Sequence, residues 1–212
     1  MIDQNFWQGK RVFLTGHTGF KGSWLSLCLK EMGATVHGYA LAPETQPALF
    51  NQLDLAEGLH HSEGDIRNLD AIRKWIVEVQ PEVVFHLAAQ PLVRRSYREA
   101  HLTWETNVMG TVNLLESLRE LKRPCAVVVV TTDKVYENQE RAYAYREGDQ
   151  LGGHDPYSSS KAAVELAVSS WRSSFLQKKN LIRVATARAG NVIGGGDWSE
   201  DRILPDLARA LA

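Results

Sequence analysis

Short continuous apolar runs alternate along this chain with segments whose apolar residues recur at three- and four-residue steps. Such runs are typical of strands buried on both faces, and the periodic segments are typical of helices. We therefore predict an α/β fold, a doubly wound parallel sheet with helices on both faces. The expected strands are 10–15, 34–40, 59–65, 83–89, 126–132 and 181–187. The expected helices are 20–32, 69–79, 99–121, 156–177 and 203–212, and the longer loops are 42–54, 137–154 and 190–197.

A glycine-rich turn joins the first expected strand to the first expected helix, with glycines at 16, 19 and 22. Gly16 permits a tight turn, Gly19 lets the backbone approach a pyrophosphate, and Gly22 lets the helix pack close to the strand. The helix N-terminus would direct N–H groups and the positive end of its dipole at the phosphates. Ordinary turns also contain spaced glycines, but the order of strand, glycine turn and helix favours a dinucleotide site.

Tyr157 and Lys161 lie four positions apart at the start of the helix expected after Pro156, on one face and one turn apart. A neighbouring ammonium favours phenolate, so it would lower the pKa of the tyrosine towards the range of a useful base. An exposed surface pair would show the same spacing. Polar or small residues also follow several strands, and ligands of such sheets bind at those carboxyl ends. The combination predicts a catalytic site at this edge.

Composition excludes several functional classes. The net charge of −1, the apolar fraction of 44% and the charged fraction of 23% describe a globular protein with no electrostatic preference for nucleic acid or a membrane surface. No apolar run could span a bilayer, and residues 1–10 lack a signal-peptide core, so we expect a cytoplasmic protein. Cys28 and Cys125 are expected in the core. The seven histidines lack metal-ligand spacing, so no metal is expected, and His60-His61 is interpreted as an exposed strand pair.

Together with the glycine turn, Asp65-Ile66 and Tyr157/Lys161, four segments resemble the extended short-chain dehydrogenase/reductase family. They are residues 86–94, 106–111, 131–136 and 187–198. Within that family the chain is most similar to the nucleotide-sugar 4,6-dehydratases that act on CDP-glucose, and the similarity covers essentially all 212 residues. It implies an NAD-binding Rossmann domain over 1–188 and the start of a smaller substrate-binding region at 189–212. We expect the remainder of that region to be missing from this chain, which would weaken CDP-glucose binding, and the activity of the chain by itself stays open.

The resemblance also implies residue roles. Tyr157 would take the proton of the sugar 4-hydroxyl as hydride leaves C4, Lys161 would bind the nicotinamide ribose, and Thr132 would hydrogen-bond the 4-oxygen. Asp133 would protonate the departing 6-hydroxyl before hydride returns to C6. The implied catalytic residues are Thr132, Asp133, Lys134, Tyr157 and Lys161. The implied cofactor contacts are Gly16, His17, Thr18, Gly19, Phe20, Gly22, Asp65, Ile66, Leu87, Ala88, Ala89, Tyr157 and Lys161. The implied substrate contacts are Gln90, Thr132, Asn191 and Trp198.

Two positions depart from the family pattern. Lys134 stands where most 4,6-dehydratases have the glutamate that takes the C5 proton, although lysine here is a mark of the CDP-glucose subgroup. An ammonium cannot accept a proton, so Lys134 would need a depressed pKa, or another group acts. The second strand also ends in Tyr39-Ala40-Leu41-Ala42, with no carboxylate before Glu44 to bind the adenosine ribose. NAD is still expected, because the reaction recycles it, and Asp65 would contact the adenine.

Alternative functions stay open at this stage. A 4-epimerase or reductase of the same family needs no acid at Asp133, and that carboxylate could simply cap a turn. A non-catalytic NAD-binding fragment is the third possibility. By analogy with the family, we expect a homodimer that pairs helices 99–121 and 156–177. The same analogy places the product in deoxysugar supply for a bacterial O-antigen in lipopolysaccharide.

Overall fold

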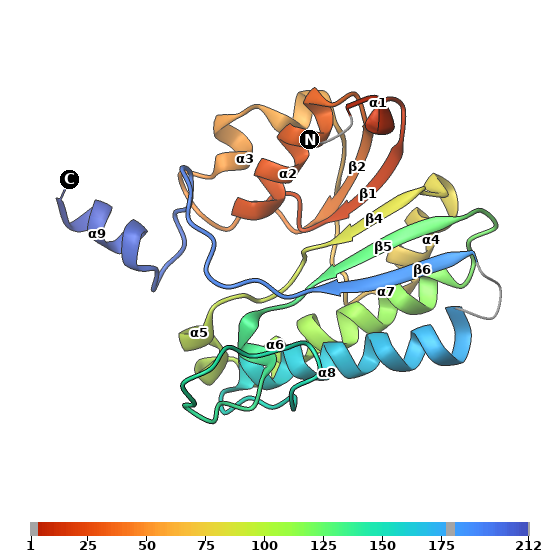
Figure 1. Cartoon of the computed structure of the whole chain (residues 1–212). Coiled ribbons are helices and arrows are strands. Elements are labelled where there is room, and N and C mark those ends of the chain that lie inside the picture. Colours follow the sequence, from red (N-terminus) through yellow and green to blue (C-terminus); the bar gives the residue numbers. More distant parts are fainter. Residues whose placement is uncertain (1–3, 177–180, 212) are drawn as a thin grey trace.

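A six-stranded, all-parallel sheet forms the centre of the protein in a computed structural model that describes residues 4–176 and 181–211 (Figure 1). The strands occur in the order β3-β2-β1-β4-β5-β6. Their bounds are β1 Arg11–Thr15, β2 Thr35–Ala40, β3 His60–Glu63, β4 Val83–His86, β5 Cys125–Val130 and β6 Ile182–Ala187. The predicted Rossmann-type sheet is confirmed.

The order of the strands reverses at the centre of the sheet, where β1 lies between β2 and β4. Thr15 pairs with Tyr39 on one side and with His86 on the other. His86 in turn pairs with Val129 of β5, so the carboxyl ends of four strands lie at one edge. In open α/β sheets, this reversal leaves a crevice at the carboxyl edge where ligands bind.

Helices pack on the sheet in two layers, seen above and below it in Figure 1. The first layer contains α4 Leu69–Val79, α7 Gly110–Leu118 and α8 Pro156–Trp171, and it covers the main apolar core. The second layer contains α2 Phe20–Glu31 with the short α1 Gln4–Trp7, and a smaller core lies beneath it. Only the first layer extends across the whole sheet. On the other face of the sheet, Ala126, Ala185 and Ala187 of β5 and β6 are exposed. Among the described residues, the predicted helices on both faces are therefore found only in the half of the sheet away from β5 and β6.

Helix α2 turns small residues towards the sheet together with part of its apolar stripe, since Leu25 and Leu29 both pack against the core beneath it. Gly22, Ser23, Ser26 and Leu29 are its buried residues. Trp24 is 41% exposed, and Cys28 is exposed rather than in the core. Small side chains let the helix axis approach the sheet, which leaves the larger ones outside. The prediction for Cys125 is confirmed: it is buried, and burial raises the pKa of its thiol to about 12.

The long helical region predicted over 99–121 is present but divided. It begins with α5 Val93–Arg98, then α6 Ala100–Trp104, a π-helical turn Glu105–Met109, and α7. The apolar residues of this region differ in burial: Leu115 and Leu118 are fully buried, whereas Val108 and Val112 are half-buried. A π turn contains an extra residue, so it rotates the residues that precede it out of the 3.6-residue pattern.

The remaining segments contain short helices and turns. The predicted loop 42–54 contains a short helix, α3 Leu49–Gln52, and a 3₁₀ turn Leu55–Gly58 follows it. The predicted loop 137–154 is irregular apart from an isolated bridge between Tyr136 and Leu151. Other elements are the 3₁₀ turn Asp133–Val135, the π turn Arg172–Leu176 and α9 Ile203–Leu211. The helix ends predicted at 177 and 212 lie outside the described residues. None of the helices described is both long and apolar enough to cross a membrane.

Candidate functional site

The glycine turn after β1 adopts the geometry that its sequence requires. Gly16 has a φ of +75°, and its N–H bonds the Tyr39 carbonyl at 3.1 Å. A Cβ on Gly16 would lie 2.6 Å from Ala88 N, and one on Gly22 would overlap the Gly16 carbonyl. Gly19 is the exposed N-cap of α2, and no side chain caps the helix there. The turn is therefore a cradle of bare backbone at a helix N-terminus, which fits the pyrophosphate of a dinucleotide.

His17 lies within this turn, but its imidazole is fully buried. Its Nε2 lies 2.7 Å from His61 Nδ1, and its ring meets the Phe50 ring edge-on at 5.3 Å. Burial, and then the neighbouring His61, lowers the pKa of His17 to about 4. His61 is thus half-buried against His17, and only His60 of the predicted exposed pair is exposed. Through its side chain, His17 joins the glycine turn to β3. Next to it, the buried Thr18 bonds the Leu41 carbonyl at 2.8 Å.

Thr132, Asp133 and Lys134 contact one another just beyond the carboxyl end of β5. The buried Thr132 hydroxyl donates to Asp133 Oδ1 at 3.1 Å, and Lys134 Nζ lies 3.3 Å from the same oxygen. The Asp133 side chain is 55% exposed, and its backbone N–H bonds the Ala189 carbonyl at 3.0 Å. A Cβ on Gly190 would lie 3.3 Å from Asp133 Oδ2. The carboxylate thus opens towards solvent beside the segment that follows β6.

Tyr157 and Lys161 stand on the first turns of α8, which begins with Asp155 as its N-cap. Asp155 Oδ1 accepts the Ser158 N–H at 2.9 Å. Both Tyr157 and Lys161 are buried, and Lys161 Nζ donates to the Val130 carbonyl at 3.1 Å. Burial, followed by repulsion from Lys21, lowers the pKa of Lys161 to about 8.

The expected lowering of the Tyr157 pKa by Lys161 is not observed in the protein alone. Burial raises the pKa of Tyr157, and the Thr132 hydroxyl and Arg202 only partly oppose this. The Lys161 ammonium donates to the β5 backbone, so its charge is engaged there. Lys21 and Arg202 are two cations near this pair that the sequence analysis did not single out. Lys21 follows Phe20 in the glycine turn, and that position was the available signal.

Gln90 lies in the interior rather than on a surface open to substrate. Its amide donates to Leu92 O at 3.1 Å and Thr103 Oγ1 at 2.9 Å, and its oxygen accepts the Leu92 N–H at 2.7 Å. Asn107, which the sequence analysis passed over, bonds the Gln90 backbone N–H at 2.8 Å and Ser160 Oγ at 2.9 Å. As placed, Gln90 shapes the turn after β4. A buried asparagine inside an apolar helix was the signal that could have revealed Asn107.

The far end of the crevice has no free carboxylate at the end of β2. Asp65 accepts the Arg67 N–H at 2.9 Å and pairs with its guanidinium at 2.6 Å, and this pairing holds the pKa of Asp65 below its usual range. Glu44 forms an ion pair with Arg95. The Asp65 oxygens are thus shared with Arg67. Ile66 next to it is buried, while Leu87, Ala88 and Ala89 are half-buried at the end of β4.

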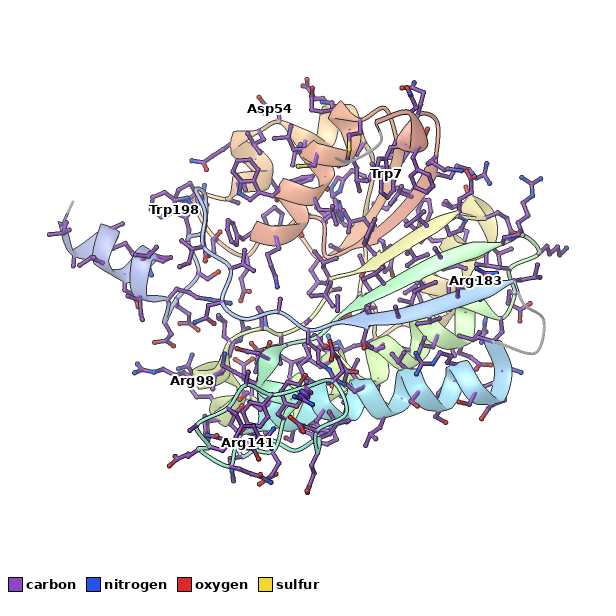
Figure 2. All side chains as sticks on the ribbon, in the orientation of Figure 1. Trp7, Asp54, Arg98, Arg141, Arg183 and Trp198 are labelled. Carbon is purple, nitrogen blue, oxygen red and sulfur yellow. The ribbon has the colours of Figure 1, made fainter. Side chains whose placement is uncertain are left out.

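One segment after β6 passes from the Asp133 side of the site to the glycine turn. Trp24 Nε1 donates to the Gly195 carbonyl at 3.0 Å, and Phe20 lies 3.2 Å from where a Cβ of Gly194 would be. Asn191 is exposed in this segment. Trp198, labelled in Figure 2 near α9, is half-buried and its indole N–H has no partner in the described part of the chain. Among those residues, no three His, Cys, Asp or Glu side chains converge as a metal site requires.

Comparison with known proteins identifies relatives over the whole chain. The GDP-mannose 4,6-dehydratase family matches residues 13–187. CDP-glucose 4,6-dehydratase of Salmonella typhimurium is 54% identical over 215 aligned residues, which cover all of this chain and 60% of that protein. CDP-paratose 2-epimerase of Salmonella typhi is 29% identical over 171 residues, or 73% of this chain and 51% of that one.

Solved structures give the same picture. A double mutant of dTDP-glucose 4,6-dehydratase from Streptomyces venezuelae, with NAD bound, superposes with a TM-score of 0.81 at 25% identity, over 95% of this chain and 62% of that one. UDP-glucose 4-epimerase of Thermotoga maritima shares the fold, with a TM-score of 0.80 at 22% identity, over 92% of this chain and 61% of that one. This chain thus matches between about half and three fifths of the length of these relatives. The resemblance inferred from the motifs is confirmed, and the chain belongs to the GDP-mannose 4,6-dehydratase family.

Proposed function

We propose that the protein converts CDP-glucose to CDP-4-keto-6-deoxyglucose with NAD as a cofactor that each turnover regenerates. One observation carries the proposal: Thr132, Asp133, Tyr157 and Lys161 lie at the carboxyl end of β5 and the start of α8, on a sheet whose first turn is a bare glycine cradle. The 54% identity to a CDP-glucose 4,6-dehydratase supports the choice of nucleotide sugar.

The glycine turn would hold the NAD pyrophosphate on the backbone between Gly16 and Gly22, and Lys161 would bind the nicotinamide ribose. The other proposed contacts are His17 and Thr18 through their backbone, with Phe20, Asp65, Ile66, Leu87, Ala88 and Ala89. A bound NAD would supply the acceptor for the hydride of C4 and its donor to C6. Because no free carboxylate ends β2, we expect weaker binding of the adenosine ribose than in dinucleotide sites that have one.

The chain's own groups would move the protons. Tyr157 would take the proton of the sugar 4-hydroxyl, and the Thr132 hydroxyl would hydrogen-bond the same oxygen. A 4-ketone acidifies the C5 proton, so water can leave across C5 and C6 once Asp133 protonates the 6-hydroxyl. The half-exposed Asp133 side chain lies beside Thr132, so both groups could reach the same substrate. Lys134 bonds Asp133 and would have to lose its own proton to take the C5 proton; otherwise another group or a water would take it.

The raised pKa of Tyr157 has to fall before this tyrosine can act as a base. Burial raises it in the protein alone, so the lowering must accompany the bound state, in which Lys161 would exchange its bond to the Val130 carbonyl for the ribose. Gln90, Asn191 and Trp198 are proposed on the substrate side, Gln90 through the turn that it shapes. We also propose a cytoplasmic homodimer that supplies a deoxysugar for an O-antigen.

The test uses CDP-glucose that carries deuterium at C4, incubated with the protein and NAD. We expect a 4-keto-6-deoxy product with deuterium at C6, seen by NMR and mass spectrometry. Tyr157→Phe and Asp133→Asn should each reduce turnover by at least about 100-fold, while Tyr143→Phe, an exposed control, should not. CDP-galactose as the product would show an epimerase, and NAD binding without turnover would show a binding fragment.

A further inference from the structure

His86, the last residue of β4, links the central sheet to the helix layer that covers it. Its imidazole is buried, and both ring nitrogens have partners. Nδ1 lies 2.7 Å from the hydroxyl of Thr15, at the end of β1, and Nε2 lies 3.0 Å from the hydroxyl of Thr111 in α7. The sequence analysis assigned His86 no role of its own.

The partners determine which ring nitrogen carries the proton. The Thr111 hydroxyl donates its single hydrogen to the Asn107 carbonyl at 2.6 Å, so it can only accept from His86. Nε2 is therefore the protonated nitrogen, and the lone pair of Nδ1 accepts the Thr15 hydroxyl. The Thr15 oxygen in turn accepts the Ala88 N–H at 3.3 Å. Each hydrogen of this buried chain thus has one position.

The Thr15–Ala88 bond holds two turns against each other at the crevice. Gly16 follows Thr15 directly, and it is packed so closely on Ala88 that a Cβ would lie 2.6 Å from Ala88 N. Both turns belong to the proposed dinucleotide site. If Thr15 pointed its hydroxyl elsewhere, the Ala88 N–H would lose its partner and the spacing of the two turns would no longer be fixed.

We propose that His86, as the Nε2–H tautomer, is a positioning residue of the dinucleotide site: it orients the Thr15 hydroxyl, which sets the approach of the Ala88 turn to the Gly16 turn. This inference rests on the proposed NAD-dependent function. Burial, with a smaller contribution from Lys161, lowers the pKa of His86 to about 3, so the imidazole stays neutral and keeps this tautomer at ordinary pH.

Two readouts test the proposal. The first is the ¹⁵N–¹H correlation spectrum of the histidine rings of the wild-type protein between pH 5.5 and 8.5. We expect His86 to show a protonated Nε2 and a bare Nδ1 that do not change with pH. A protonated Nδ1, or titration of His86 in this range, would overturn the inference even if no variant folds.

The second readout is NAD affinity in Thr15 variants. Thr15→Val keeps the shape and removes the hydroxyl, so we expect NAD to bind about tenfold more weakly, the equivalent of about 1.4 kcal/mol. Thr15→Ser keeps the hydroxyl and should restore the affinity, and Thr35→Val, at the start of β2, is the matched control. Wild-type affinity in Thr15→Val would overturn the positioning role alone. Absence of NAD binding in the wild type would overturn the proposed function and this role with it.

Discussion

Glu165 and Arg188 form a bidentate ion pair in which each carboxylate oxygen accepts a guanidinium N–H at 3.0 Å. Glu165 stands one turn after Lys161 in α8, and Arg188 follows the last residue of β6. The Thr131 and Thr186 hydroxyls also donate to Glu165, at 2.6 and 2.8 Å. Although burial alone would raise the pKa of Glu165, these bonds outweigh it and lower the pKa. The pair thus ties α8 to the ends of β5 and β6.

Removing one partner of this pair should destabilise the protein strongly. The Glu165 side chain is only 6% exposed, so Arg188→Met would leave a buried carboxylate without its counter-ion. We expect a loss of about 3 kcal/mol in the free energy of unfolding, measured by urea titration at pH 7.5. Arg73→Met, which removes an exposed pair with Asp70, should cost less than about 1 kcal/mol. Equal effects of the two variants would contradict this account.

Gly38 should not tolerate a methyl group. It lies in the middle of β2, and a Cβ there would overlap the buried imidazole of His17. Gly38→Ala should therefore lower the free energy of unfolding by about 1–3 kcal/mol, because neither the strand nor the packed ring can move away easily. Gly195→Ala is the matched control, since no atom lies within 4 Å of its would-be Cβ. A thermal unfolding midpoint for Gly38→Ala equal to that of the control would rule the clash out.

Stability should fall as the pH decreases from about 6.5 to 5. His17 and His37 have native pKa values of about 4, and His86 has one of about 3, all below the value of about 6.5 expected in the unfolded chain. Above pH 6.5 both states are neutral, so this contribution is fully present. Below it the unfolded chain binds protons that the native state does not, which removes up to about 2 kcal/mol per histidine by pH 5.

Urea titrations at pH 7.5, 6.5, 5.5 and 5.0 measure that loss. His17→Asn removes one of the three histidines with a lowered pKa and should reduce the pH dependence by about a third. His101→Gln, at a side chain that is 88% exposed, should leave it unchanged. A free energy of unfolding that stays constant between pH 6.5 and 5 would show that these rings titrate normally in the native state.

The sheet and the glycine turn were predictable from the sequence because they depend on local patterns. Apolar runs predict the strands, and Gly16, Gly19 and Gly22 predict the turn because they stand between an expected strand and an expected helix. The buried face of α2 was not predictable, because the closeness of the helix to the sheet favours serine over tryptophan there. The burial of His17 was missed for a similar reason. Its partner His61 lies 44 positions away, and only the folded chain brings the two rings together.

The proposed catalytic groups show the same division. Motifs single out Thr132, Asp133, Tyr157 and Lys161, and where these residues lie follows from the strand end and the helix start. The direction of the Tyr157 pKa was not predictable, because it depends on burial and on where Lys161 donates its hydrogen bond. Spacing along a helix places two side chains on one face. It does not determine which acceptor the longer one reaches.

Exposed apolar side chains on α6, the π turn after it and α8 should bind a second copy of the protein, as the proposed homodimer requires. Trp104, the last residue of α6, is 43% exposed, and Met109, the last residue of the π turn, is 51% exposed. Leu166 of α8 is 62% exposed. Burying such residues between two copies would remove apolar surface from water, which stabilises the dimer by about 25 cal/mol per Å².

Leu166→Glu would place a charge in that interface, so we expect the molar mass measured by light scattering to halve. Val77→Glu on α4, 45% exposed in the wild type, controls for the added charge and should remain dimeric. A monomeric wild-type protein at micromolar concentration would refute the dimer, because it would show that these side chains stay in water.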